Sequence, residues 1–114
     1  MKDGFIKVAA ATPEIKVADC AFNASSVISL IAEAEVKGAA VIVFPELCLT
    51  GGTAGDLFFT DALLSNAEEA LLRIIKATKK SSSIVFVGLP IMRDGLIYDC
   101  AAVVSGGSLL GIVP

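Results

Sequence analysis

Two short segments of the chain are apolar at every position, and they restrict the fold more than any other feature. They cover residues 39–44 (AAVIVF) and residues 84–87 (IVFV), the second within an expected strand over 84–89. A strand with one face in water alternates apolar and polar residues, whereas an unbroken apolar run indicates burial on both faces. We therefore expect both segments to be strands of a sheet that is covered by helices or by a second sheet.

Three further segments have the composition of strands. Each is short, rich in Val and Ile or other apolar residues, and bounded by Gly, Pro, Asp or Ser. They cover residues 5–11, 97–104 and 108–113. Turn residues lie between the last strands, at residues 93–95 (RDG) and 105–107 (SGG), which predicts hairpins there.

Two segments between these strands have helical periodicity. Residues 23–37 carry apolar side chains in partial helical spacing, and Gly38 follows as a C-cap. The second segment predicts a helix more clearly, because its apolar residues keep to one face. Its acidic residues also precede its basic ones, as the helix dipole favours. Its expected apolar face consists of Leu63, Leu64, Ala67, Ala70, Leu71, Ile74, Ile75 and Thr78. The order of elements predicts an α/β fold with a sheet of mixed strand directions.

Composition limits the classes of partner. The 114 residues are 55% apolar and 18% charged, with a formal net charge of -3. No basic stripe is present, so we expect no nucleic-acid partner. No apolar run approaches the roughly 18 residues that cross a bilayer, so we expect no membrane span. The sequence has no repeat, linker or low-complexity tract, and we expect residues 1–114 to belong to one domain without an internal boundary.

The cysteines indicate neither disulfides nor a metal site. Cys20, Cys48 and Cys100 are an odd number without CxxC spacing, and the chain has no histidine. We expect reduced thiols that are mostly buried, with no metal-binding or cofactor-binding residue in this segment. Glu14 and Lys16 interrupt the N-terminal apolar run before a signal-peptide core can form, which predicts a cytoplasmic protein.

Glu46 is the candidate catalytic residue, because it comes directly after the apolar run at residues 39–44. Ligands of open α/β sheets bind at the carboxyl ends of the strands. Burial there would raise the pKa of the carboxyl group toward the range of a general base. Capping of nearby amides, or pairing with a basic group, is the non-catalytic alternative.

Two neighbouring features invite other interpretations. Cys48 lies two residues after Glu46, and residues i and i+2 share a face in an extended segment. A thiol beside a carboxylate has a raised pKa, however, which argues against a nucleophile. The glycine-rich residues 51–55 resemble a phosphate cradle, but they match no phosphate-binding motif and lie between Glu46 and Asp56, which repel phosphate. Asp56 is the expected N-cap of the next helix.

The residues around Glu46 resemble a known family. The string VIVFPELCLTGGTAGDLF, residues 41–58, is similar to the first catalytic segment of carbon-nitrogen hydrolases, the nitrilase superfamily. ELCLTG followed by GDLF resembles in particular the glutaminase domain of glutamine-dependent NAD+ synthetases. Two later strings, IVFVGLPI (84–91) and LIYDCAAVVSGGSLLGIVP (96–114), match the next strands of that family in order. The resemblance covers nearly the whole chain.

The resemblance implies a fold and a reaction. The fold would be the N-terminal part of a nitrilase-like α-β-β-α sandwich with a mixed sheet, incomplete in this chain. Glu46 would be the general base of a Glu-Lys-Cys triad in which the cysteine attacks the amide of glutamine. The released ammonia would pass to a synthetase domain that uses ATP and Mg²⁺ to amidate deamido-NAD. The lysine would fall directly after Pro114 and the cysteine further along, so we expect the chain as given to be inactive.

Two positions depart from the family pattern, and two alternatives stay open. Gly52 stands where an aromatic residue is usual, and Ala54 where Cys is common, which would loosen the loop after Glu46. The alternatives are another amidase of the same superfamily, or a non-catalytic structural or assembly fragment. The apolar strands at the end of the sequence need cover, which predicts a homo-oligomer.

Overall fold

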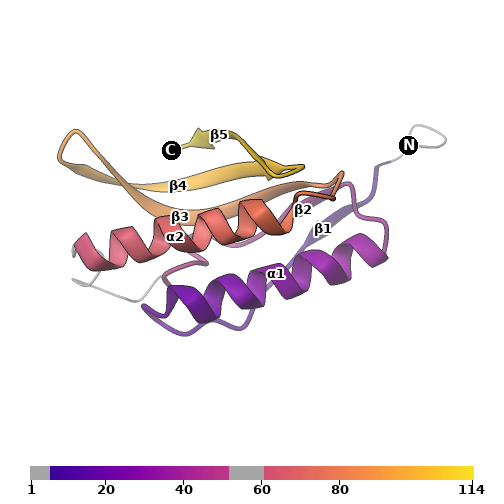
Figure 1. The fold of residues 1–114 in the computed structure, drawn as a ribbon, viewed down its shortest axis with the longest axis horizontal. Helices are drawn as coiled ribbons and strands as arrows, with labels where there is room; N and C mark the ends of the chain where they lie inside the picture. Colours follow the sequence, from indigo (N-terminus) through magenta and orange to yellow (C-terminus); the bar gives the residue numbers. More distant parts are fainter. Residues whose placement is uncertain (1–5, 52–60) are drawn as a thin grey trace.

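Five strands and two helices form a two-layer structure in the computed structural model, which describes residues 6–51 and 61–114 (Figure 1). The strands follow one another in the sheet in the order in which they occur in the chain. β1, β2 and β3 are parallel, whereas β3, β4 and β5 form an antiparallel meander. The expected α/β fold with a mixed sheet is confirmed. The elements are β1 (Val8–Ala10), α1 (Cys20–Val36), β2 (Val41–Val43), α2 (Asp61–Ala77), β3 (Ile84–Arg93), β4 (Leu96–Ser105) and β5 (Ser108–Val113).

Local sequence explains where α1 begins and ends. The Asp19 carboxylate accepts a hydrogen bond from the Phe22 amide at 3.0 Å, so it caps the helix, which begins at Cys20 rather than at residue 23. The helix ends at Val36, and Gly38 follows with a φ of 81°. A positive φ is accessible to glycine without steric cost, so Gly38 ends the helix as expected.

Both predicted hairpins are present, and their turns have the same geometry. Asp94 and Gly95 join β3 to β4 with φ values of 53° and 78°, and Gly106 and Gly107 join β4 to β5 with values of 57° and 83°. Two consecutive residues with positive φ are typical of the type I′ turn, whose twist matches that of the flanking strands. The turn residues therefore fix the register of the meander.

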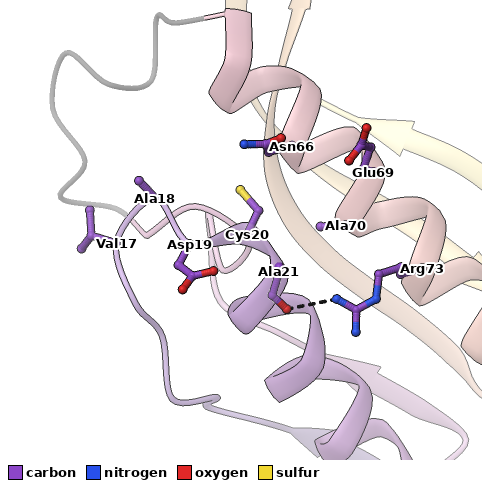
Figure 2. A pocket seen from close by; sticks show the side chains of 9 residues that line it. All are labelled: Val17, Ala18, Asp19, Cys20, Ala21, Asn66, Glu69, Ala70 and Arg73. Atoms are coloured by element: carbon purple, nitrogen blue, oxygen red, sulfur yellow. Dashed lines mark hydrogen bonds between the residues drawn. The ribbon is translucent and has the colours of Figure 1, made fainter.

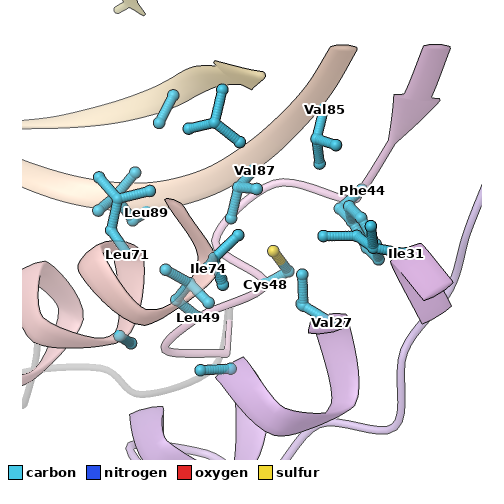
Figure 3. Packing of buried hydrophobic residues seen from close by; sticks show 14 of the residues in the cluster. Val27, Ile31, Phe44, Cys48, Leu49, Leu71, Ile74, Val85, Val87 and Leu89 are labelled. Atoms are coloured by element: carbon cyan, nitrogen blue, oxygen red, sulfur yellow. The ribbon is translucent and has the colours of Figure 1, made fainter. Parts of the chain in front are cut away.

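The hydrophobic core lies between the helices and one face of the sheet (Figure 3). The expected apolar face of α2 is confirmed, except that Ile75 is only partly buried. Neither α1 nor α2, the two helices within the described ranges, has the length and apolarity that a bilayer crossing requires. The strand side chains of the core are Ile42, Val85, Val87, Leu89, Ala102 and Val104.

The expectation of burial on both faces is wrong for the residues that the structure describes. Both helices lie on the same side of the sheet (Figure 1), so side chains that alternate with the core residues have no helix above them. Val8 is 61% exposed and Val43 is 41% exposed. We call this surface the helix-free face. Its strand residues include Val8, Val41, Val43, Ile84, Phe86, Ala101, Val103 and Val113.

Candidate functional site

Glu46 lies just beyond the carboxyl end of β2, at the helix-free face. The Phe44 amide still donates to the Phe86 carbonyl at 3.0 Å, and the chain then leaves the sheet. Glu46 lines a pocket of about 250 Å³ together with Asp99, from β4. The other lining residues are Val43, Phe44, Pro45, Phe86, Gly88, Cys100, Ala101, Val113 and Pro114. A carboxylate thus opens into a pocket with mostly apolar walls.

The expected burial of Glu46 is wrong. Its side chain is exposed, because it stands on the face of the sheet that α1 and α2 leave uncovered. The structure instead leaves the Glu46 side chain accessible from the pocket that it lines.

A tight turn fixes the backbone that follows Glu46. Leu47 has a φ of 51°, in the left-handed region that side chains other than glycine rarely adopt. Its carbonyl accepts hydrogen bonds from the amides of Thr50, at 3.1 Å, and Gly51, at 2.8 Å. The Leu49 amide donates to the Gly88 carbonyl at 3.2 Å, which ties the turn to β3. The position of Glu46 therefore depends on both the turn and β3.

Cys48 points away from Glu46. Its thiol is fully buried among Val27, Ile74 and Val87 (Figure 3) and donates to the Gly88 carbonyl over 3.6 Å. The expectation that positions 46 and 48 share a face is wrong, because the left-handed Leu47 between them breaks the alternation. Desolvation raises the pKa of the Cys48 thiol to about 11, so burial rather than a neighbouring carboxylate makes it unreactive.

The other thiols are equally unsuited to nucleophilic attack. Cys20 and Cys100 are free and buried, as expected. Burial raises the pKa of each thiol, and the charges of Asp19 and Asp99 respectively raise it further. None of the three cysteines of the sequence therefore has the depressed pKa of an activated nucleophile.

A buried asparagine that binds the turn after Glu46 was missed by sequence reasoning, which placed Asn23 only at a helix start. Asn23 is fully buried, and its Oδ1 accepts from the Lys16 amide at 2.7 Å. Its Nδ2 donates to the carbonyls of Lys16, at 2.8 Å, and Leu49, at 2.9 Å. The signal was present, because Asn23 falls on the helical stripe of Val27 and Ile31, where a polar residue needs partners.

A larger pocket, of about 390 Å³, lies at the beginning of α1 beside α2 (Figure 2). Arg73 lines this pocket, and it donates to the Ala21 carbonyl at 3.1 Å and to the Ser25 hydroxyl at 2.9 Å. These bonds fasten α2 to α1, so Arg73 has a structural role here. The size of this pocket does not make it the functional site.

Some predicted features lie outside the described residues, and no metal site is found within them. Gly52, Ala54 and Asp56 fall in the range 52–60, outside the described part of the chain, as does most of the glycine-rich loop. Across residues 6–51 and 61–114, no group of three or more His, Cys, Asp or Glu side chains is arranged to hold a metal ion.

Comparison with known proteins shows which family the chain resembles. The family model for carbon-nitrogen hydrolases matches residues 7–112 of the chain. The glutamine-dependent NAD(+) synthetase of Mycobacterium tuberculosis is 38% identical over 111 residues, which cover 97% of this chain and 16% of that protein. The synthetase of the same name from Aquifex aeolicus is 36% identical over 84% of this chain and 17% of its own length. The chain thus spans about a sixth of the curated relatives it matches.

Solved structures of related proteins have the same fold as this chain. A crystal structure of a glutamine-dependent NAD(+) synthetase from Cytophaga hutchinsonii superposes with a TM-score of 0.87 at 29% identity, over 94% of this chain and 18% of that one. An amidase from Nesterenkonia sp. superposes with a TM-score of 0.76 at 16% identity, over 98% of this chain and 43% of that one. At that identity the amidase supports the fold alone.

Proposed function

Since this chain belongs to the carbon-nitrogen hydrolase family, we propose that it contributes the glutamate of a glutaminase active site, with Glu46 as the general base. The observation that carries the proposal is the place of Glu46, open to a pocket at the carboxyl end of a parallel strand. A general base must come within hydrogen-bond distance of the proton that it removes. The exposed Glu46 side chain, which lines the pocket, is accessible to such a proton, whereas the Cys48 thiol is buried and has a raised pKa.

In the proposed reaction Glu46 accepts the thiol proton of a cysteine as its sulfur attacks the amide carbon of glutamine. Ammonia leaves with a proton returned to it, and water then releases glutamate from the thioester. The three cysteines of this sequence are buried with raised thiol pKa values, so none of them fits this nucleophile. The nucleophile, and the lysine that stabilises the oxyanion, are proposed to come from other parts of a longer protein. By itself the chain is proposed to be inactive.

The longer protein is proposed to supply ammonia for the ATP-dependent amidation of deamido-NAD to NAD+. Support comes from the relatives, which bear the name glutamine-dependent NAD(+) synthetase and are about six times as long as the segment they share with this chain. ATP and Mg²⁺ would serve a separate synthetase domain. Among the described residues no group of three or more candidate ligand side chains is gathered, and the proposal assigns both ATP and Mg²⁺ to that other domain. No step of the glutaminase reaction depends on either group.

A cytoplasmic location and a homo-oligomeric state are part of the proposal. The three cysteines are all free thiols, which is the usual state in a reducing compartment. β5 is an edge strand of the described sheet, and its Leu110 is 60% exposed. An apolar edge of this kind favours pairing with another strand.

The test is the variant Glu46→Gln in the full-length protein, assayed for NAD+ formation with glutamine and, separately, with ammonia. Loss of a general base lowers the rate by about 10²- to 10⁴-fold, and this loss is expected only with glutamine as the nitrogen source. Glu68→Gln, which neutralises an exposed carboxylate of α2, is the matched control and is expected to retain both activities. Glutamine-dependent activity that survives Glu46→Gln would overturn the proposal.

A further inference from the structure

We infer that Gly88 is a positioning residue for Glu46, because the absence of a side chain at Gly88 makes room for the turn that carries the glutamate. The inference rests on the proposed function of Glu46. Gly88 is a buried residue of β3, and its missing side chain points to the helix-free face, where Glu46 lies. Its φ is not in the left-handed region, so the requirement is for space and not for backbone conformation.

The space at Gly88 is filled by backbone atoms. A Cβ atom added there would lie 2.5 Å from the Leu47 nitrogen, 2.6 Å from the Pro45 carbonyl oxygen and 2.9 Å from the Glu46 carbonyl carbon. Contacts below 3.0 Å are not tolerated by real Cβ atoms. Because all three neighbours are main-chain atoms, no side-chain rotation can relieve the overlap.

The sheet holds Gly88 in place, so the turn would have to move. β3 pairs with β4 in a register that places Gly88 opposite Ala101, and it pairs with β2 up to Phe86. The turn has fewer bonds to the sheet, namely those from the Leu49 amide and the Cys48 thiol to the Gly88 carbonyl. It also contains Leu47, whose left-handed conformation is kept only by its surroundings. A methyl group at Gly88 therefore displaces Pro45, Glu46 and Leu47.

Displacement of Glu46 affects catalysis more than substrate binding. A misplacement of about 1 Å can lower a rate by about 100-fold, because proton transfer depends on alignment. A loss confined to the transition state lowers kcat and leaves KM near its original value. Gly88→Ala is therefore expected to lower kcat for glutamine by about 100-fold, with KM changed little.

The experiment compares Gly88→Ala with two controls in the full-length protein. Gly111→Ala adds the same methyl group to a strand glycine of β5 that has nothing within 4 Å of the added atom, and full activity is expected. Val85→Ala removes two methyl groups from the fully buried core side of β3. It reports what loss of stability alone does to kcat and KM. NAD+ formation with ammonia is measured for each variant as a record of the synthetase domain, and the melting temperature is measured as a record of folding.

If Gly88→Ala fails to fold, two variants of Leu47 test whether the conformation of the turn positions Glu46. Asn adopts the left-handed region readily, whereas β-branched Val does so at a steric cost. Leu47→Val is expected to lower kcat for glutamine and to leave ammonia-dependent activity intact. Leu47→Asn is expected to retain most of the kcat for glutamine. Equal kcat values for the two variants would overturn the inference.

The outcomes separate this inference from the proposed function. Loss of glutamine-dependent activity in Glu46→Gln together with a normal kcat in a folded Gly88→Ala would refute positioning by Gly88 and leave the role of Glu46 intact. Full activity of Glu46→Gln would refute both. A fall in kcat in Gly88→Ala no greater than that in a Val85→Ala variant of similar melting temperature would show that stability alone is affected, and it too would refute positioning.

Discussion

The Asn23 side chain donates a hydrogen bond to the Leu49 carbonyl over 2.9 Å, and it thereby connects the first helix to the segment that follows Glu46. The same amide group binds both backbone groups of Lys16. One buried side chain thus holds three segments of the chain together: the loop before α1, the helix itself and the end of the turn.

Replacement of Asn23 by Ala is expected to lower the free energy of unfolding by about 2–4 kcal/mol, since it leaves buried carbonyl and amide groups without partners. The measurement is the midpoint of urea unfolding. Ser29→Ala, on the exposed side of the same helix, is the control and should change stability by less than about 0.5 kcal/mol. An equal effect of the two substitutions would contradict the role given to Asn23.

Thr78 joins the end of α2 to the last hairpin. Its buried hydroxyl donates to the Ile75 carbonyl at 2.7 Å and accepts from the Gly107 amide at 3.1 Å. Thr78→Val keeps the shape and removes both bonds, so a loss of roughly 1–3 kcal/mol in stability is expected from thermal unfolding. Thr78→Ser retains the hydroxyl, and it should be the more stable of the two variants.

The buried Cys48 thiol predicts a dependence of stability on alkaline pH. Burial raises its pKa from 9.0 to about 11, so between these values the folded state keeps a proton that the unfolded state releases. The contribution of this thiol to the free energy of unfolding is therefore fully present below pH 9 and is lost as the pH rises toward 11. The loss amounts to roughly 2–3 kcal/mol, at about 1.4 kcal/mol for each pH unit. Urea unfolding at several pH values measures this slope.

Cys48→Ala is the comparison for that slope. The variant is less stable at neutral pH but lacks the titrating thiol, so its stability should fall less steeply than that of the unmodified protein between pH 9 and 11. Cys20 and Cys100 also have raised thiol pKa values and contribute equally to both proteins. Parallel curves for the two proteins would exclude the Cys48 thiol as the cause.

Exposed apolar residues of β5 predict self-association of the polypeptide 1–114 at micromolar concentration, measured by light scattering. Leu110→Lys places a charge on this edge strand and should shift the distribution toward monomer. Val36→Lys changes an isolated residue at the end of α1 that is 88% exposed, and it should have no such effect. A monomeric starting protein would contradict the prediction.

Isolated polypeptide 1–114 is expected to release no ammonia from glutamine above background. The reason is chemical, since its three thiols are buried with raised pKa values and cannot act as nucleophiles at neutral pH. An ammonia assay at millimolar glutamine checks this. Turnover by this polypeptide would show that one of its own residues replaces the expected cysteine.

The features that sequence analysis predicted correctly depend on local patterns. The apolar face of α2 follows from helical spacing, and the bounds of β5 agree with the expected strand at residues 108–113. The turn at Asp94 and Gly95 follows from the preference of these residues for positive φ. Each of these signals is contained in a few neighbouring residues.

The features that were missed depend on contacts between distant segments. The exposure of Glu46 follows from the placement of both helices on one side of the sheet, which no pattern near Glu46 encodes. The left-handed Leu47 occurs in a residue type that does not favour it, so its cause lies in the packing of the turn against β3. Asn23 gave a readable signal, because its place on an apolar stripe requires buried partners.

The arrangement of the sheet has a consequence for the order of folding. β3, β4 and β5 are linked by two-residue turns, so their pairing joins neighbours in sequence and has a low entropic cost. β1 and β2 pair in parallel through intervening helices, which requires larger loops to close. We therefore expect the C-terminal meander to form first and to be the template on which the earlier strands assemble, so that Glu46 reaches its final position only after residues that follow it in the chain have folded.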